Sequence, residues 1–123
     1  MFFNKRNKIK EKIVWQMLDV KDWNKRTFRD ATMGGQLEKL EEEMKEFQEA
    51  PNKEEAAKEL ADIFIVLGGL IRWNSRIGAF LEDFYFDNLK TKSLENLSKA
   101  IDAKMEINRK RKWHKTGKGK FHH

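Results

Sequence analysis

The sequence of 123 residues contains no cysteine and a single proline, Pro51. Without cysteine the chain can form neither disulfide bonds nor thiolate metal sites. It also lacks a long apolar run, because its most hydrophobic stretch, residues 60–71, is too short to cross a bilayer. The start of the chain, MFFNKRNKIK, has no apolar segment of the kind found in secretory signals. These absences predict a cytoplasmic protein with no membrane segment.

The net charge of +6 is distributed unevenly along the chain. Residues 36–62 carry ten acidic side chains against four basic ones, whereas residues 104–120 carry eight basic side chains against one acidic one. A basic protein often binds nucleic acid. An acidic middle and a basic end equally suit a site where a metal ion binds the acids and phosphates bind the bases.

The spacing of apolar residues predicts an all-α fold. Helices are expected over residues 7–20, from about 36 to 50, from about 53 to 71, over 75–89, and from an N-cap at Ser93 onward. Gly34 and Gly35 are expected to break the chain before the second of these helices. The length predicts one domain, residues 1–123, built as a four- to five-helix bundle with a basic tail from about residue 109.

The centre of this fold is predicted to be an antiparallel helical hairpin with its hinge at Pro51 and Asn52. Asn52 is a good N-cap, and Glu55 stands at the capping-box position after it. The second helix of the hairpin reads LADIFIVLGGLI from Leu60 and is apolar on every face, which predicts that it is buried.

Two pairs of acids, Glu43/Glu46 and Glu59/Asp62, lie on this hairpin with the same spacing. A separation of three places both members of a pair on one helix face. Folding at the hinge brings Glu46 level with Glu59 and Glu43 level with Asp62. Four converging carboxylates repel one another unless cations or protons are bound, and oxygen ligands select Mg²⁺ or Mn²⁺.

Other interpretations of these acids are open. Acidic runs often form only a solvated helix face, and Glu38/Glu41 and Glu46/Glu49 have the same spacing as Glu43/Glu46. The levels across the hairpin favour Glu43/Glu46, because Glu38/Glu41 would lie more than a turn too far from the hinge.

The ordered pair of ExxE and ExxD motifs, the latter within ELADIFIVLGGL, resembles the signature of MazG-like all-α nucleoside triphosphate pyrophosphatases. That superfamily also includes dimeric dUTPases and dCTP pyrophosphatases. The resemblance implies that the four acids bind Mg²⁺, with Mn²⁺ as a possible substitute, and are the catalytic residues. It also implies hydrolysis of a nucleoside triphosphate to a monophosphate and pyrophosphate, in nucleotide-pool control or house-cleaning.

A second candidate group, Lys104, Asn108 and Arg111, shares one face of the last helix at positions i, i+4 and i+7. These donors suit a chain of phosphate oxygens, although a solvated basic terminus has the same pattern. The motif K-x-x-x-N-x-x-R-x-W resembles the closing motif of one MazG-like branch, which implies triphosphate binding. Either Arg109 or Arg111 could make the phosphate contact. No role is assigned to His122 and His123.

Apolar and aromatic positions give further expectations. Trp23 could stack on a nucleobase or lie in the core. Gly68 and Gly69 predict close packing of their helix against another helix, within the chain or across a subunit boundary, and a kink is the alternative. Two stripes are expected to pack inward: Leu37, Leu40, Met44 and Phe47, and Ile77, Phe80, Leu81 and Phe84. Some of Phe84, Tyr85 and Phe86 are expected to be buried against another subunit, so the chain should form a homodimer or a homotetramer.

Two functions therefore compete. The first is a Mg²⁺-dependent nucleoside triphosphate pyrophosphohydrolase. The second is a non-enzymatic basic helical bundle that binds nucleic acid through its tail, which does not account for the lone Asp62 in an apolar helix.

Overall fold

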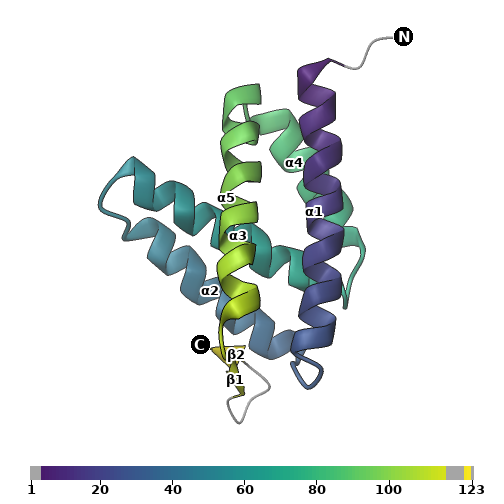
Figure 1. Ribbon diagram of the computed structural model, residues 1–123, viewed down its shortest axis with the longest axis vertical. Helices are drawn as coiled ribbons and strands as arrows, with labels where there is room; N and C mark the ends of the chain where they lie inside the picture. The colour runs from purple at the N-terminus through teal and green to yellow at the C-terminus, as the bar shows by residue number, and fades with distance from the viewer. Residues whose placement is uncertain (1–3, 116–120, 123) are drawn as a thin grey trace.

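The computed structural model describes residues 4–115 and 121–122, without the side chains of Tyr85, Phe86, Lys115 and His122. It contains five helices and one antiparallel pair of two-residue strands (Figure 1). The helices are α1 (Lys5–Thr27), α2 (Met33–Gln48), α3 (Lys53–Leu70), α4 (Arg76–Asn88) and α5 (Thr91–Lys110), and the strands are β1 (His114–Lys115) and β2 (Phe121–His122). The predicted all-α class is confirmed.

The helices α2 and α3 form the predicted antiparallel hairpin, which crosses the side-by-side helices α1 and α5 (Figure 1). Asn52 is the N-cap of α3, and its Oδ1 accepts a hydrogen bond of 2.9 Å from the backbone N–H of Glu55. Thr32 caps α2 in the same way through Gly35. These two caps fix where each arm of the hairpin begins.

Three helix boundaries differ from those predicted. α1 continues beyond residue 20 to Thr27, because Trp23 and Asn24 are buried against the rest of the fold. Gly34 and Gly35 lie inside the first turn of α2 rather than in a break, since Thr32 supplies the cap. α5 begins at Thr91 with Lys90 at the N-cap, which forms no side-chain cap bond, so the prediction of Ser93 as the N-cap is wrong.

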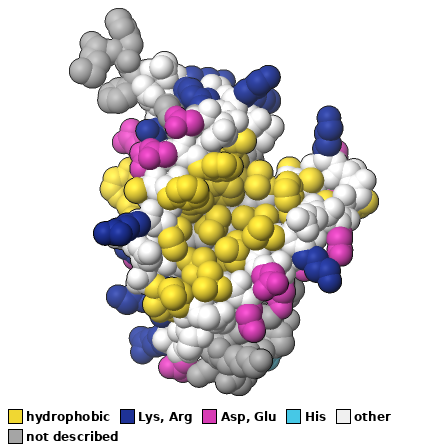
Figure 2. Space-filling model, turned by 180° about the vertical axis from the view of Figure 1, so that it is seen from behind, with side chains coloured by type: hydrophobic (Ala, Val, Ile, Leu, Met, Phe, Trp, Pro, Cys, Tyr) yellow, Lys and Arg dark blue, Asp and Glu magenta, His cyan; other side chains and the backbone are white. Residues whose placement is uncertain are grey.

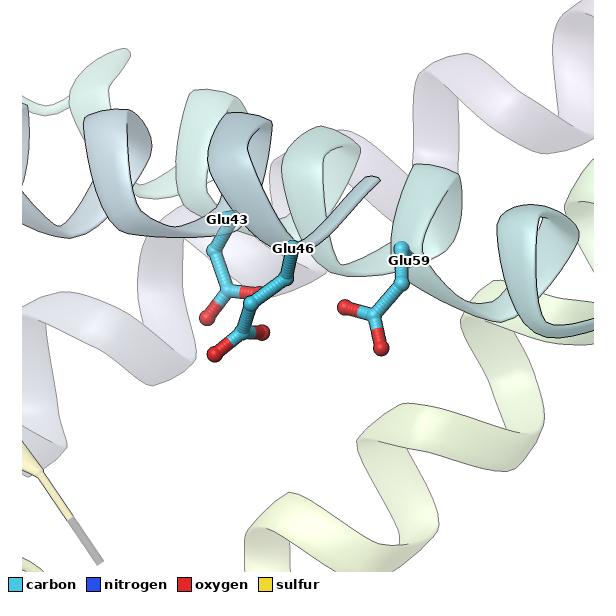
Figure 3. A group of neighbouring side chains, drawn as sticks. All are labelled: Glu43, Glu46 and Glu59. Atoms are coloured by element: carbon cyan, nitrogen blue, oxygen red, sulfur yellow. The ribbon is translucent and has the colours of Figure 1, made fainter. Parts of the chain in front are cut away.

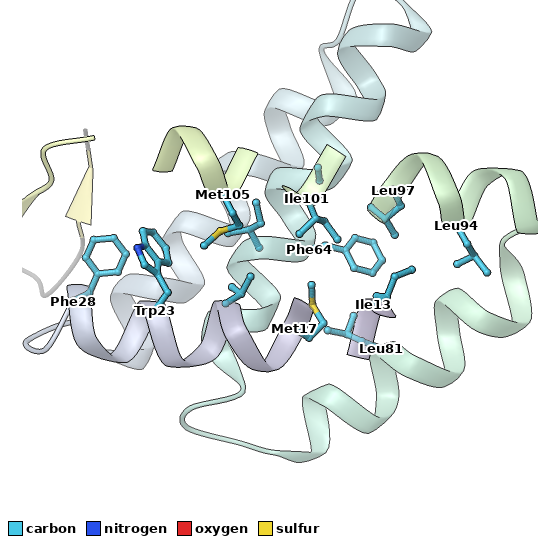
Figure 4. Packing of buried hydrophobic residues seen from close by; sticks show 13 residues of the cluster. Ile13, Met17, Trp23, Phe28, Phe64, Leu81, Leu94, Leu97, Ile101 and Met105 are labelled. Atoms are coloured by element: carbon cyan, nitrogen blue, oxygen red, sulfur yellow. The ribbon is translucent and has the colours of Figure 1, made fainter. Parts of the chain in front are cut away.

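The core lies where α1, α3 and α5 meet, as Figure 4 shows. Ile13 and Met17 of α1, Phe64 of α3, and Leu97 and Ile101 of α5 are all almost completely buried. The middle of α3 is buried on most of its circumference, as its sequence predicted. The helix that carries Glu59 and Asp62 is therefore held firmly by apolar packing.

The prediction that two apolar stripes, one on α2 and one on α4, pack inward is largely wrong. Phe80 and Phe84 of α4 are 68% and 51% exposed, although Leu81 between them is buried. Leu37, Met44 and Phe47 of α2 are also exposed, whereas Glu43 is buried on the same helix. Figure 2 shows hydrophobic side chains gathered over much of one molecular face.

None of the described helices combines the length and the apolar character that a membrane span requires.

Gly68 makes the predicted close helix contact with α1 of the same chain, and Gly69 lies close to both α1 and α2. A Cβ atom at Gly68 would lie 2.9 Å from Val20 Cγ1 and 3.4 Å from Met17 Sδ. Val20 is a β-branched residue within a helix, so its side chain cannot easily turn away. The absence of a side chain therefore sets the spacing between α1 and α3.

Gly68→Ala should destabilise the protein by about 1–3 kcal/mol, because overpacking outweighs a gain in helix propensity of about 1 kcal/mol. Urea unfolding would measure the change. Gly34→Ala is the matched control, since a Cβ atom there meets nothing closer than Thr32 Oγ1 at 4.0 Å. Equal stability of the two variants would contradict this account of the α1–α3 contact.

Candidate active site

A cavity of about 230 Å³ lies between the α2–α3 hairpin, the end of α1 and the end of α5. All eight residues that the sequence singled out as site candidates line it. The lining side chains are Trp23, Asn24, Phe28, Gln36, Lys39, Glu43, Glu46, Glu59, Asp62, Ile65, Val66, Lys104, Asn108, Arg111, Trp113 and Phe121.

Three of the four predicted acids form a tight group. One carboxylate oxygen each from Glu43, Glu46 and Glu59 lies within 4.8 Å of the others. Figure 3 shows the two side chains of α2 and the one of α3 pointing towards the same space. The hairpin therefore produces the convergence that the residue spacing predicted.

Asp62, the fourth acid, lines the same cavity but is paired with a lysine. Lys104 Nζ of α5 donates a hydrogen bond of 3.1 Å to Asp62 Oδ2. Lys39 Nζ lies 3.5 Å from Glu43 Oε1 in a comparable ion pair within α2. Each helix of the hairpin thus has a cavity-lining carboxylate that is partly neutralised by a lysine.

The clustered carboxylates of Glu43, Glu46 and Glu59 repel one another. Burial, the charge of Asp62 and the neighbouring Glu46 raise the pKa of Glu43 to about 7, although Lys39 opposes this rise. Burial and the charges of Asp62 and Glu46 also raise the pKa of Glu59. Glu43 Oε2 and Glu59 Oε2 are buried and accept no hydrogen bond from any described residue.

These features fit a hard cation. Two buried anionic oxygens without a donor are costly unless a proton or a metal ion compensates them. The donor set is oxygen only, which matches Mg²⁺ or Mn²⁺. Glu43, Glu46 and Glu59 could hold such an ion directly, and Asp62 could join them if Lys104 moved away.

The alternative acidic positions lie elsewhere. Glu38, Glu41 and Glu49 line a separate surface groove of α2 and do not line the cavity. Their spacing alone matched that of Glu43 and Glu46, and only the folding of the hairpin distinguishes them.

The predicted phosphate-binding residues lie together at the end of α5. Asn108 is buried, its Oδ1 accepts a hydrogen bond of 3.2 Å from Arg111 Nη1, and its backbone carbonyl accepts one of 3.1 Å from Trp113 Nε1. Asn108 therefore orients Arg111 over the cavity. Of the two arginines that the sequence left open, Arg111 lines the cavity, whereas Arg109 is exposed and does not.

Trp23 is almost fully buried and packs edge-to-face against other aromatic rings. Its ring centroid lies 5.2 Å from that of Phe28 and 6.0 Å from that of Trp113. Phe121 of β2 packs against Phe28 at 4.8 Å. Trp23 thus belongs to the aromatic wall of the cavity and is also a member of the core.

Sequence reasoning missed several lining residues. Lys39 stands four positions before Glu43, so helical spacing could have identified it. Asn24, Gln36 and Phe121 gave no such signal, because contacts between distant parts of the chain bring them to the cavity. The sequence also predicted a basic tail from about residue 109. Its residues 116–120 and His123 lie outside the described residues.

An all-α hairpin that presents clustered carboxylates and nearby cationic side chains to one cavity suits a metal-dependent hydrolase of phosphoric anhydrides. The family model described as dATP/dGTP pyrophosphohydrolase matches residues 17–123. The chain belongs to this family, which is one of the MazG-like all-α nucleoside triphosphate pyrophosphatases.

The resemblance seen in the motifs is therefore confirmed, and the protein is a hydrolase that acts on nucleoside triphosphates. Of the two competing functions, the family match supports the enzyme and not the non-enzymatic bundle. Comparisons with curated proteins and with solved structures gave no match.

The raised pKa of Glu43 predicts how the metal-free protein responds to pH. Its folded-state pKa of about 7 lies above the ordinary value of 4.5, so the folded protein retains a proton that the unfolded chain releases. The bound proton on Glu43 therefore stabilises the folded state. This stabilisation is fully present below about pH 4.5 and is lost as the pH rises through about 7. Glu43→Gln should flatten this decline, as measured by urea unfolding in EDTA.

Glu38→Gln, on the exposed side of α2, is the control and should leave the decline unchanged. Added Mg²⁺ should stabilise the wild type more at high pH than at low pH, because a metal ion binds the ionised carboxylates. Identical profiles for the wild type and Glu43→Gln would contradict the assignment of the raised pKa.

Proposed function

We propose that this protein is a Mg²⁺-dependent dATP/dGTP pyrophosphohydrolase that converts each substrate to a monophosphate and pyrophosphate. The observation that carries the proposal is the cavity in which donor-free carboxylate oxygens of Glu43 and Glu59 lie near the cationic side chains of Lys104 and Arg111. The family description supplies the substrate class.

Glu43, Glu46, Glu59 and Asp62 are the proposed metal ligands. When bound, Mg²⁺ neutralises phosphate charge and lowers the pKa of coordinated water. In the metal-free site the ammonium of Lys104 pairs with Asp62 and supplies the positive charge that a bound metal ion would supply. Once Asp62 has another partner, the ammonium of Lys104 is available to a phosphate oxygen.

Lys104, Asn108 and Arg111 are the proposed triphosphate contacts. Ammonium, amide and guanidinium donors on one helix end can follow successive phosphate oxygens, and charged donors form the stronger hydrogen bonds. They stabilise the negative charge that builds up on the departing pyrophosphate.

In the hydrolysis, the oxygen of a water molecule forms a bond to phosphorus while the anhydride P–O bond breaks. The bonding electrons leave with the pyrophosphate oxygen, and the proton of the water passes to a carboxylate that acts as general base. Removal of dATP and dGTP in this way would control or clean a nucleotide pool, which suits a cytoplasmic location.

The direct test is a screen of the common dNTPs and NTPs with Mg²⁺ that resolves the products. Release of pyrophosphate with dAMP or dGMP supports the proposal, whereas release of phosphate with a diphosphate overturns it.

Substitution of single acids on α2 tests whether Glu43 and Glu46, rather than the equally spaced Glu38/Glu41 or Glu46/Glu49, form the site. Glu43→Gln and Glu46→Gln should each lower kcat/KM by about 100-fold or more, since even outer partners of a metal site cost 10–100-fold. Glu38→Gln and Glu49→Gln should have little effect, because both residues lie in the separate groove. Steady-state kinetics and Mn²⁺ titration would measure this, and equal damage by Glu38→Gln would refute the register.

Arg111→Ala should behave differently from the acid variants. Mn²⁺ affinity should survive, while kcat/KM for the triphosphate falls by about 10- to 100-fold, as expected for loss of one charge-assisted phosphate contact. Arg109→Ala is the matched control, since Arg109 is exposed and does not line the cavity. If the two variants lose activity equally, Arg111 has no special role.

We also propose that the chain forms a homodimer or a homotetramer through the outer side of the hairpin. Leu40, Met44, Phe47, Ile63 and Leu67 line an apolar groove there, between α2 and α3. Met44 and Phe47 are 47% and 38% exposed. A second copy of the same groove would cover these side chains symmetrically, as isologous interfaces do.

Sedimentation should therefore show at least a dimer at micromolar concentration, and Phe47→Glu should shift it to the monomer. Ile107→Glu, which alters a more exposed apolar residue on α5, is the control and should leave the assembly intact. A wild-type monomer at that concentration would overturn the proposal.

A further inference from the structure

Two amide side chains, those of Asn24 and Gln36, line the cavity together with the aromatic wall and both approach Gly69. Asn24 of α1 is 2% exposed, and Gln36 of α2 is half-buried. A Cβ atom at Gly69 would lie 2.6 Å from Asn24 Nδ2 and 2.8 Å from Gln36 Nε2. Gly69 therefore makes room for both amides at one place.

Hydrogen bonds fix the orientation of both amides. Arg72 Nη1 donates 2.9 Å bonds to Asn24 Oδ1 and to the carbonyl of Phe28, and its guanidinium lies 4.3 Å from the ring centroid of Trp73. Gln36 Nε2 donates a 3.2 Å bond to the carbonyl of Val66. Among the described residues no hydrogen bond occupies Asn24 Nδ2 or Gln36 Oε1, and one N–H of Gln36 Nε2 is also left over. Both residues line the cavity, so Asn24 can offer a donor there and Gln36 an acceptor.

The position of this pair along the hairpin suits the base of a nucleotide. Gln36 lies seven residues before Glu43 on α2, and Val66 lies seven residues after Glu59 on α3. Seven residues of helix correspond to about 10 Å. The amides thus lie about two helical turns from the carboxylates, which leaves space for a sugar and part of the triphosphate between them.

We propose that Asn24 and Gln36 recognise the purine base, an inference that rests on the proposed dATP/dGTP hydrolysis. Adenine and guanine share the N7 acceptor, and they differ at position 6, where adenine has an amino donor and guanine a carbonyl acceptor. Asn24 Nδ2 donates to N7 of either base. Gln36 Oε1 accepts from the amino group of adenine.

This arrangement gives an order of preference. Pyrimidines have no N7, so they lose the contact with Asn24. Guanine keeps that contact, but its O6 would face Gln36 Oε1, and two acceptors repel each other. Only the N–H of Gln36 Nε2 that is not bonded to Val66 could donate to O6, and the amide would have to shift to reach it. The enzyme should therefore prefer dATP to dGTP, and both to dCTP and dTTP.

The test compares dATP and dGTP with 7-deaza-dATP and 7-deaza-dGTP on the wild-type enzyme. The 7-deaza analogues carry a C–H group in place of N7 and are otherwise the same size. Each analogue should have a kcat/KM about tenfold lower than its parent, the effect of losing one hydrogen bond. Equal values for analogue and parent overturn the proposal, with no variant needed.

Variants assign the effect to residues. Asn24→Leu should make each 7-deaza analogue equal to its parent, and Gln36→Leu should remove the preference for dATP over dGTP. Arg72→Met should weaken the 7-deaza effect through Asn24, as expected of a positioning residue. Gln16→Leu is the control, because Gln16 is a buried amide bonded to Ser98 and Asp102 and does not line the cavity.

The outcomes separate the two proposals. If the wild type releases pyrophosphate from dATP but ignores N7, the function stands and the recognition by Asn24 is wrong. If no nucleoside triphosphate yields pyrophosphate, the proposed function itself fails. Persistence of the full 7-deaza effect in Asn24→Leu also overturns the role of Asn24.

Discussion

The mutual repulsion of carboxylates held on a rigid hairpin is the constraint on which the rest of the structure depends. Glu43, Glu46 and Glu59 would separate if their helices could move apart. The packing of α2 along α3 holds them together, and Phe64 and Ile65 in turn anchor α3 in a core shared with α1 and α5. Hydrophobic burial on one side of α3 thus offsets the electrostatic cost on the other, and this stored strain is what makes a cation favourable there.

The cavity also explains why the bundle needs its three longest helices in one place. α3 contributes Glu59 and Asp62, α5 contributes Lys104 and Asn108, and the end of α1 contributes Asn24. Arg72, just beyond α3, donates to Asn24 and to the carbonyl of Phe28, so the end of α1 is held against the hairpin. A shift of any one of these helices would change both the polar groups and the core.

Local rules account for the part of the structure that the sequence could predict. Capping by Asn52 and helical spacing were sufficient to place the hairpin and its acids, since both depend on neighbouring residues. The continuation of α1 to Thr27 depends instead on burial of Trp23 and Asn24 by distant segments. The exposure of Phe80 and Phe84 could not be predicted from the sequence either. An apolar stripe shows the same pattern whether it packs inside its own chain or against another surface.

Charge balance in the cavity limits how a substrate can enter. With all groups ionised, the four carboxylates outnumber the cationic Lys39, Lys104 and Arg111. A triphosphate alone would add several negative charges to a site that is already anionic, so it should enter only together with cations or protons. The aromatic wall of Trp23, Phe28, Trp113 and Phe121 carries no charge and suits the base instead. The separation of charged and aromatic walls would thus favour one orientation of the proposed nucleotide substrate, with its phosphates towards the hairpin acids.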